Sequence, residues 1–201
     1  MKNILFSLLV LMGVSGLAYA EGDAEAGKSK AAACAGCHGA DGNSAVASFP
    51  KLAGQNVRYL VKQMHDIKDG DRSVPAMMGQ LDNKSDQDMQ DIAAYFSSQF
   101  PTVGAADKDL VELGEKIYRA GSKESGVSAC IACHSPTGKG NAMAGFPALS
   151  GQHAEYIATQ LRAFREGERT NDGDAKMMRS VAFRLTNKEL DAVASYISGL
   201  H

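Results

Sequence analysis

All four cysteines of the sequence lie in two copies of one five-residue pattern, at residues 34–38 and 130–134. Each copy is C-x-x-C followed at once by histidine, which is the attachment signature of c-type haem. Positions i, i+3 and i+4 share one face of a helical turn. Two thiols on that face can form thioethers to the two vinyl groups of one porphyrin, with the imidazole beneath the iron. The pattern predicts two covalently bound haem c groups, attached at Cys34, Cys37, Cys130 and Cys133, with His38 and His134 as proximal iron ligands.

Other uses of paired cysteines explain this pattern less well. Four cysteines in an exported chain could form two disulfides, and two C-x-x-C pairs could together bind a tetrahedral zinc ion. Neither explains why a histidine follows each pair. A thioredoxin-like motif needs a βαβ context, and no strand pattern surrounds either pair. The haem interpretation is therefore favoured over these three.

An internal repeat locates the elements that must position the motifs. Phe49–Gln55, with the sequence FPKLAGQ, returns 97 residues later as Phe146–Gln152, with the sequence FPALSGQ. At the same spacing, three further residues of the first copy return in the second: Tyr59, Gln63 and Gly70 become Tyr156, Gln160 and Gly167. The chain therefore consists of two similar units.

Each unit is expected to contain three helices. The first leads into the haem motif, around residues 24–33 and 108–120, and the middle one has apolar residues at helical spacing from Val57 and from Ala154. The last begins with a capping-box pattern, formed by Ser85 with Asp88 and by Thr186 with Glu189. No strand alternation is present, so the predicted fold class is all-α. We predict domains at residues 21–103 and 104–201, joined by a linker around 100–106 with Pro and Gly.

The repeat also selects a candidate sixth ligand for each iron. Each copy has two adjacent methionines after its middle helix, Met77-Met78 and Met177-Met178. Before the last helix the repeat spacing is 101 residues, which places about four extra residues of the second copy around 171–174. At this spacing only Met77 and Met178 are equivalent, so we predict them as the axial ligands. A loop methionine that packs against a haem edge is the alternative, and it suits Met78 and Met177.

The N-terminal twenty residues resemble a secretory signal. Lys2 precedes an apolar stretch from Ile4 to Leu17, and Ala18-Tyr19-Ala20 has the form of a cleavage site. We therefore expect cleavage after Ala20 and a periplasmic mature protein. The formal net charge is −2, which gives no global basic field to attract nucleic acid.

Together, both C-x-x-C-H motifs, the paired F-P-x-L-x-G-Q segments, the late methionines and the ending Ser195–His201 resemble the di-haem cytochrome c4 family. The resemblance implies two tandem class I cytochrome c domains related by a pseudo-two-fold axis, with haem propionates near the domain interface. It implies periplasmic electron delivery, often toward a haem–copper terminal oxidase, with loose membrane association in some members. It also implies that the carbonyls of Pro50 and Pro147 fix the proximal imidazoles, and that Gly27 and Gly114 let the first helix cross the last.

Two irons that each carry His and Met would have no open position, which favours one-electron transfer between respiratory partners over catalysis. The main alternative is a di-haem enzyme, such as a peroxidase or a sulfur-compound dehydrogenase. A sensing haem module is a third class. Both alternatives need an open or labile iron position.

Overall fold

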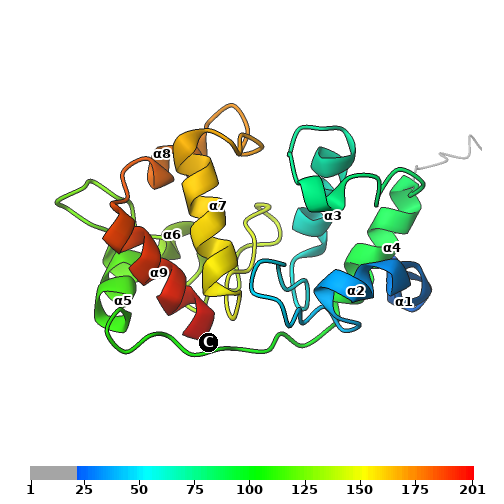
Figure 1. Ribbon diagram of the computed structural model, residues 1–201, viewed down its shortest axis with the longest axis horizontal. Coiled ribbons are helices and arrows are strands. Elements are labelled where there is room, and N and C mark those ends of the chain that lie inside the picture. The colour runs from blue at the N-terminus through cyan, green and yellow to red at the C-terminus, as the bar shows by residue number, and fades with distance from the viewer. Residues whose placement is uncertain (1–21) are drawn as a thin grey trace, which may run out of the picture.

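The computed structural model describes residues 22–201, which fold into two helical lobes that lie side by side (Figure 1). The predicted signal segment and its cleavage after Ala20 fall outside the described residues. The N-terminal lobe contains the α-helices α1 (Ala24–Lys30), α2 (Ala35–His38), α3 (Val57–Lys68) and α4 (Asp86–Ser97), with the 3₁₀ turns η1 (Ala31–Cys34) and η2 (Pro75–Met77). The C-terminal lobe contains α5 (Val111–Ala120), α6 (Ile131–His134), α7 (Ala154–Glu166), α8 (Met177–Ala182) and α9 (Asn187–Gly199).

The observed fold confirms the all-α prediction. Between residues 22 and 201, extended pairing is limited to two isolated bridges, Ser122 with Val127 and Asn141 with Phe146. Both predicted capping boxes are present: Ser85 and Thr186 each accept a hydrogen bond from the backbone three residues on, and the acidic residue there accepts one in return. These caps satisfy backbone N–H groups at the start of α4 and α9.

Two helix boundaries differ from the predicted ones. The helix expected from residue 108 begins at Val111 because the Asp107 carboxylate accepts a hydrogen bond from the Asp109 N–H at 2.8 Å. Such a side-chain turn competes with helix formation. In the first lobe, α1 ends at Lys30 and the chain tightens into η1 before the haem motif.

The first and last helices of each lobe cross in close contact. α1 packs on α4, and α5 packs on α9. A Cβ atom added at Gly27 would lie 1.9 Å from the Asp91 carbonyl oxygen, and one added at Gly114 would lie 2.2 Å from that of Ala192. Glycine is therefore required at both crossings, as the family resemblance implied.

We expect Gly114→Ala to lower the free energy of unfolding of the holo-protein by about 1–3 kcal/mol, the usual cost of overpacking. The added methyl group would also lie 2.6 Å from the Cβ of Tyr196, so α5 must move away from α9. Guanidinium unfolding curves followed by circular dichroism measure the change. The matched control is Lys116→Ala, on the exposed face of the same helix; an equal loss in both variants would contradict a role for the crossing.

The two lobes differ in the size of their hydrophobic cores. The core of the C-terminal lobe holds twelve buried residues, among them Tyr118, Leu190 and Val193. That of the N-terminal lobe holds five: Ala31, Leu60, Ile92, Ala93 and Phe96. In both lobes the motif's first cysteine, Cys34 or Cys130, packs against this core.

Reciprocal hydrogen bonds join the lobes. The Gln55 side chain donates to the Ala148 carbonyl at 2.9 Å and accepts from the Ala148 N–H at 2.8 Å. The Gln152 side chain does the same with Lys51, at 2.9 Å for both bonds. Gln55 and Gln152 are equivalent in the repeat, as are Lys51 and Ala148, so the interface has the predicted pseudo-two-fold symmetry.

The extra residues of the second copy break this symmetry. Asn171 donates to the Asp66 carboxylate at 2.5 Å and accepts from the Lys62 ammonium at 3.2 Å. The insertion predicted around residues 171–174 thus lies against the N-terminal lobe.

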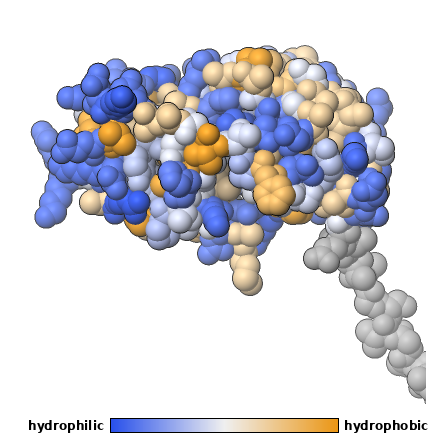
Figure 2. Space-filling model, turned by 90° about the horizontal axis from the view of Figure 1, so that it is seen from below, coloured by the Kyte–Doolittle hydropathy of each residue, from blue (hydrophilic) through white to orange (hydrophobic). Residues whose placement is uncertain are grey.

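The linker between the lobes runs along the lower edge of Figure 1. Its residues Phe100 and Val103 are 90% and 43% exposed. Figure 2 shows the molecule from that side, where apolar residues on the surface are separated by hydrophilic residues. Within the described part of the chain, the helices are too short or too polar to span a membrane.

Candidate haem-binding sites

The N-terminal haem motif forms a short helical segment at the edge of its lobe. η1 leads into α2, which ends at His38. Cys34 is partly buried against the core, Cys37 is exposed, and His38 is 7% exposed. The inner thiol and the imidazole therefore face the lobe interior, while the outer thiol lies at its surface.

The C-terminal motif repeats this arrangement in α6. Cys133 is exposed, Cys130 is partly buried and His134 is 7% exposed. The helix ends at once because the next residue has a positive φ: 80° at Gly39 in the first copy and 67° at Ser135 in the second. Ser135 is not a glycine, so this backbone is unfavourable there, and the Tyr118 hydroxyl donates to the Ser135 carbonyl at 2.7 Å and holds it.

A proline carbonyl orients each imidazole. His38 Nδ1 lies 2.9 Å from the Pro50 carbonyl oxygen, and His134 Nδ1 lies 3.0 Å from that of Pro147. A carbonyl can only accept, so Nδ1 carries the proton and Nε2 keeps a free lone pair. Burial lowers the pKa of both histidines, against the opposing effect of these carbonyls. Neutral imidazoles with Nε2 free are the form that binds iron.

The cysteine thiols are free to form thioethers. All four cysteines are unpaired, and burial raises the pKa of the Cys130 thiol to about 11. Burial also raises the pKa of Cys34. Since a thioether forms when an S–H adds across a vinyl group, free thiols at i and i+3 fit haem c.

The two cysteine pairs lie in different lobes, on α2 and α6 (Figure 1). They cannot share one tetrahedral zinc ion. Within residues 22–201, no three His, Cys, Asp or Glu side chains gather closely enough to hold a metal ion. The geometry fits one haem in each lobe.

The predicted axial methionines differ from their neighbours in exposure. Met77 ends η2 and is partly buried, whereas Met78 is 79% exposed. Met178 lies in the first turn of α8 and is partly buried, whereas Met177 is 48% exposed. In each pair the more buried methionine is the one that the repeat selects.

Comparisons with known proteins agree with this geometry. The cytochrome c family model matches residues 24–99 and again 111–201. Cytochrome c4 of Pseudomonas aeruginosa is 60% identical over 201 residues, which is all of both chains. The chain belongs to the cytochrome c4 family. The crystal structure of reduced recombinant cytochrome c4 from Pseudomonas stutzeri superposes with a TM-score of 0.88 at 57% identity, covering 90% of this chain and 100% of that one.

Membership of the cytochrome c4 family establishes two tandem cytochrome c domains with one haem c at each C-x-x-C-H motif. It makes the chain a di-haem electron carrier and not an enzyme. A more distant relative is the thiosulfate dehydrogenase electron acceptor of Stutzerimonas stutzeri. It is 37% identical over 175 residues, covering 85% of this chain and 80% of that protein.

Sequence reasoning missed two arginines at the lobe interface, Arg72 and Arg169. They are 97 residues apart, the spacing that relates Tyr59 to Tyr156 and Gln63 to Gln160. The repeat therefore contained the signal that could have found them. Each arginine donates to one of these tyrosines and to both glutamines.

Proposed function

We propose that this cytochrome carries single electrons in the periplasm between respiratory proteins, and that its acceptor is a haem–copper terminal oxidase. The observation that carries the proposal is the duplicated site, in which an oriented neutral imidazole and a partly buried methionine occur once per lobe. The proposed ligands are His38 with Met77 and His134 with Met178. The proposed domains are residues 21–103 and 104–201, after cleavage of a signal peptide following Ala20.

The chain's residues would hold, orient and close each haem. The cysteines fix it covalently, and the proline carbonyls keep the imidazole oriented and electron-rich. The methionine would be the second protein ligand of the iron and would raise its reduction potential relative to a second histidine. The haem itself supplies the exchange of one electron at its iron. With the two histidines and the two methionines bound to the two irons, no position would remain for a substrate, and the haems would supply only electron transfer.

A second candidate partner is an enzyme that oxidises thiosulfate. The 37% identical relative is named as the electron acceptor of thiosulfate dehydrogenase, and that name alone supports the alternative. Under this alternative, the thiosulfate-oxidising enzyme would be the electron donor, and the chain would still act as an electron carrier.

The proposed direction of electron flow is tested with purified holo-protein. Reduced protein is added to membrane vesicles that contain a haem–copper oxidase, and oxygen uptake and haem oxidation are followed optically. We expect rapid, cyanide-sensitive oxidation. Oxidised protein is separately mixed with thiosulfate dehydrogenase and thiosulfate. Reduction there would identify an enzyme of this kind as a donor, and no oxidation by the vesicles would refute the oxidase as the acceptor.

A further inference from the structure

The turn that follows the C-terminal haem motif contains a strained residue next to His134. Ser135 has φ 67° and ψ 161°, a backbone conformation that is essentially restricted to glycine. The corresponding turn of the N-terminal lobe has Gly39 at this position, with φ 80° and ψ 150°. Strain of this kind persists only where the surrounding structure holds it, and it is concentrated at functional sites. Ser135 therefore requires a contact that the N-terminal turn does not need.

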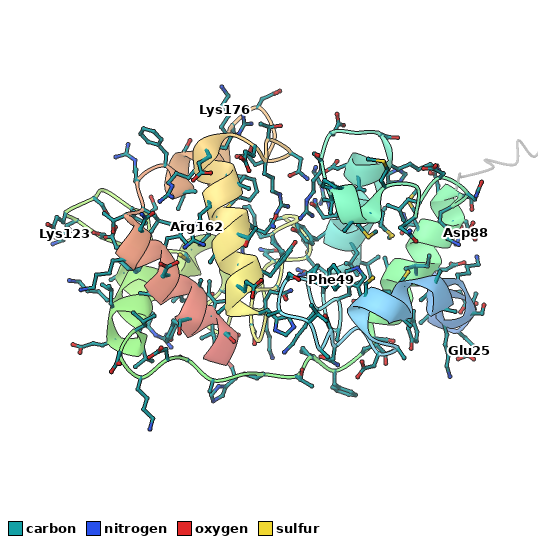
Figure 3. The ribbon with its side chains drawn as sticks, viewed as in Figure 1. Glu25, Phe49, Asp88, Lys123, Arg162 and Lys176 are labelled. Carbon is teal, nitrogen blue, oxygen red and sulfur yellow. The ribbon has the colours of Figure 1, made fainter. Side chains whose placement is uncertain are left out.

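This contact comes from Tyr118, near the C-terminal end of α5. The Tyr118 side chain is fully buried, and its hydroxyl donates to the Ser135 carbonyl at 2.7 Å and lies 3.5 Å from the His134 carbonyl oxygen. α5 lies beside α6 and α9, and the chain passes from α5 to α6 through an outer loop that carries Lys123 (Figure 3). The Tyr118 ring packs against Tyr196 of α9, with 5.6 Å between the ring centroids. The helix crossing therefore fixes the position of the hydroxyl.

The N-terminal lobe lacks both partners of this contact. When the two glycines at the helix crossings, Gly27 and Gly114, are aligned, Ala31 stands at the position of Tyr118. The Ala31 side chain has no polar group, and Gly39 adopts the backbone of the turn without strain. Tyrosine thus accompanies serine in one lobe, and alanine accompanies glycine in the other. This correspondence indicates that the hydroxyl is matched to the strained turn.

The same turn leads back to the carbonyl that orients the imidazole. The Ser135 hydroxyl accepts a hydrogen bond from the Lys139 N–H at 3.0 Å, and the His134 carbonyl accepts one from the Gly140 N–H at 2.9 Å. A Cβ atom added at Gly140 would lie 2.4 Å from the Pro147 carbonyl oxygen, so the turn packs directly against that group. The same carbonyl accepts the hydrogen bond from His134 Nδ1. A displacement of the turn would therefore move the Pro147 carbonyl relative to the imidazole.

We propose that Tyr118 is a positioning residue for the C-terminal haem. Its hydroxyl holds the turn after the haem motif, and the turn keeps the Pro147 carbonyl in place on the His134 imidazole. This rests on the proposed ligation of the iron by His134. The bond to a carbonyl makes a ligating imidazole more electron-rich, which favours Fe(III) because this state carries one positive charge more. The hydroxyl therefore lowers the reduction potential of the C-terminal haem, and the N-terminal haem lacks this contribution.

The test compares Tyr118→Phe with the double variant Tyr118→Phe/Ser135→Gly in the full holo-protein. A redox titration followed by NMR gives the potential of the haem in each lobe, and hydrogen exchange of the His134 Nδ1–H reports its bond to the Pro147 carbonyl. We expect Tyr118→Phe to raise the C-terminal potential alone and to speed this exchange about fivefold, which corresponds to the net free energy of one hydrogen bond. Since Ser135→Gly removes the strain, the double variant should return the potential and the exchange rate toward the wild type.

Tyr95→Phe is the matched control in the other lobe. The Tyr95 hydroxyl donates to the Ala40 carbonyl at 2.8 Å, beside the unstrained Gly39, so this variant should change neither potential. If Tyr118→Phe leaves the C-terminal potential and the exchange rate unchanged, the hydroxyl serves only to satisfy its own hydrogen bonding in the core, and the proposal is wrong. A double variant that stays shifted like Tyr118→Phe would also overturn it, as would an equal shift of the N-terminal potential in Tyr95→Phe.

The wild-type protein separates this proposal from the proposed ligation. If its NMR spectrum lacks hyperfine-shifted ring protons of His134, ligation of the iron by this histidine is refuted. A His134-ligated haem with a potential that does not respond to Tyr118→Phe would refute only the positioning role of Tyr118. Because phenylalanine keeps the ring that packs against Tyr196, the variant should remain folded, with two haems per chain in a pyridine haemochrome assay.

Discussion

Met77→Ala should open one of the two haems and leave the other unchanged. Without the thioether, the N-terminal iron loses its sixth ligand and the stabilisation that methionine gives to Fe(II). Carbon monoxide should then shift the reduced spectrum of about half of the haem, and one reduction potential should fall. Wild-type protein should not respond to carbon monoxide. The measurement is an optical spectrum of the fully reduced protein before and after the gas is added.

The neighbouring methionine provides the control for this variant. Met78 is 79% exposed, so Met78→Ala should bind no carbon monoxide and keep both potentials. Met178→Ala should repeat the effect of Met77→Ala at the other haem. A wild-type protein that binds carbon monoxide at half of its haem would instead favour the enzyme or sensor interpretation. A Met77→Ala variant with two unchanged haems would show that the ligand assignment is incorrect.

Loss of the N-terminal haem should unfold the N-terminal lobe. Its hydrophobic cluster has only five buried residues, too few to offset the conformational entropy of ordering the lobe without the porphyrin. Cys34→Ser combined with Cys37→Ser prevents thioether attachment. We expect this variant to contain one haem per chain, to lose the helical circular dichroism of α1, α3 and α4, and to be cut by protease within residues 22–99.

The equivalent change in the other lobe is the matched comparison. Cys130→Ser with Cys133→Ser removes the haem from a lobe that retains a core of twelve buried residues. This lobe should therefore lose less of its helical signal than the N-terminal lobe does. Full cooperative folding of the chain with neither haem attached would contradict both expectations.

Local sequence patterns were sufficient for the fold class, the haem motifs and the starts of α4 and α9. The capping boxes at Ser85 and Thr186 depend on side chains three residues apart, so they can be read directly from the chain. The start of α5 was predicted three residues early, because the Asp107 side chain makes a local turn that the apolar pattern does not reveal. The short helix α8 was not predicted either, although the repeat had selected Met178 within it.

The sequence by itself determined the chemistry, since covalent attachment depends on residue types at fixed spacing within one turn, and two such motifs specify two haems. It also paired Met77 with Met178, through the repeat. The contacts of the Pro50 and Pro147 carbonyls with the imidazoles were expected from the family resemblance, and the structure confirms them. Only the tertiary structure brought Arg72 and Arg169 together between the lobes. The arginine contacts join segments far apart in the chain and bury both side chains between the lobes. No local pattern encodes that burial.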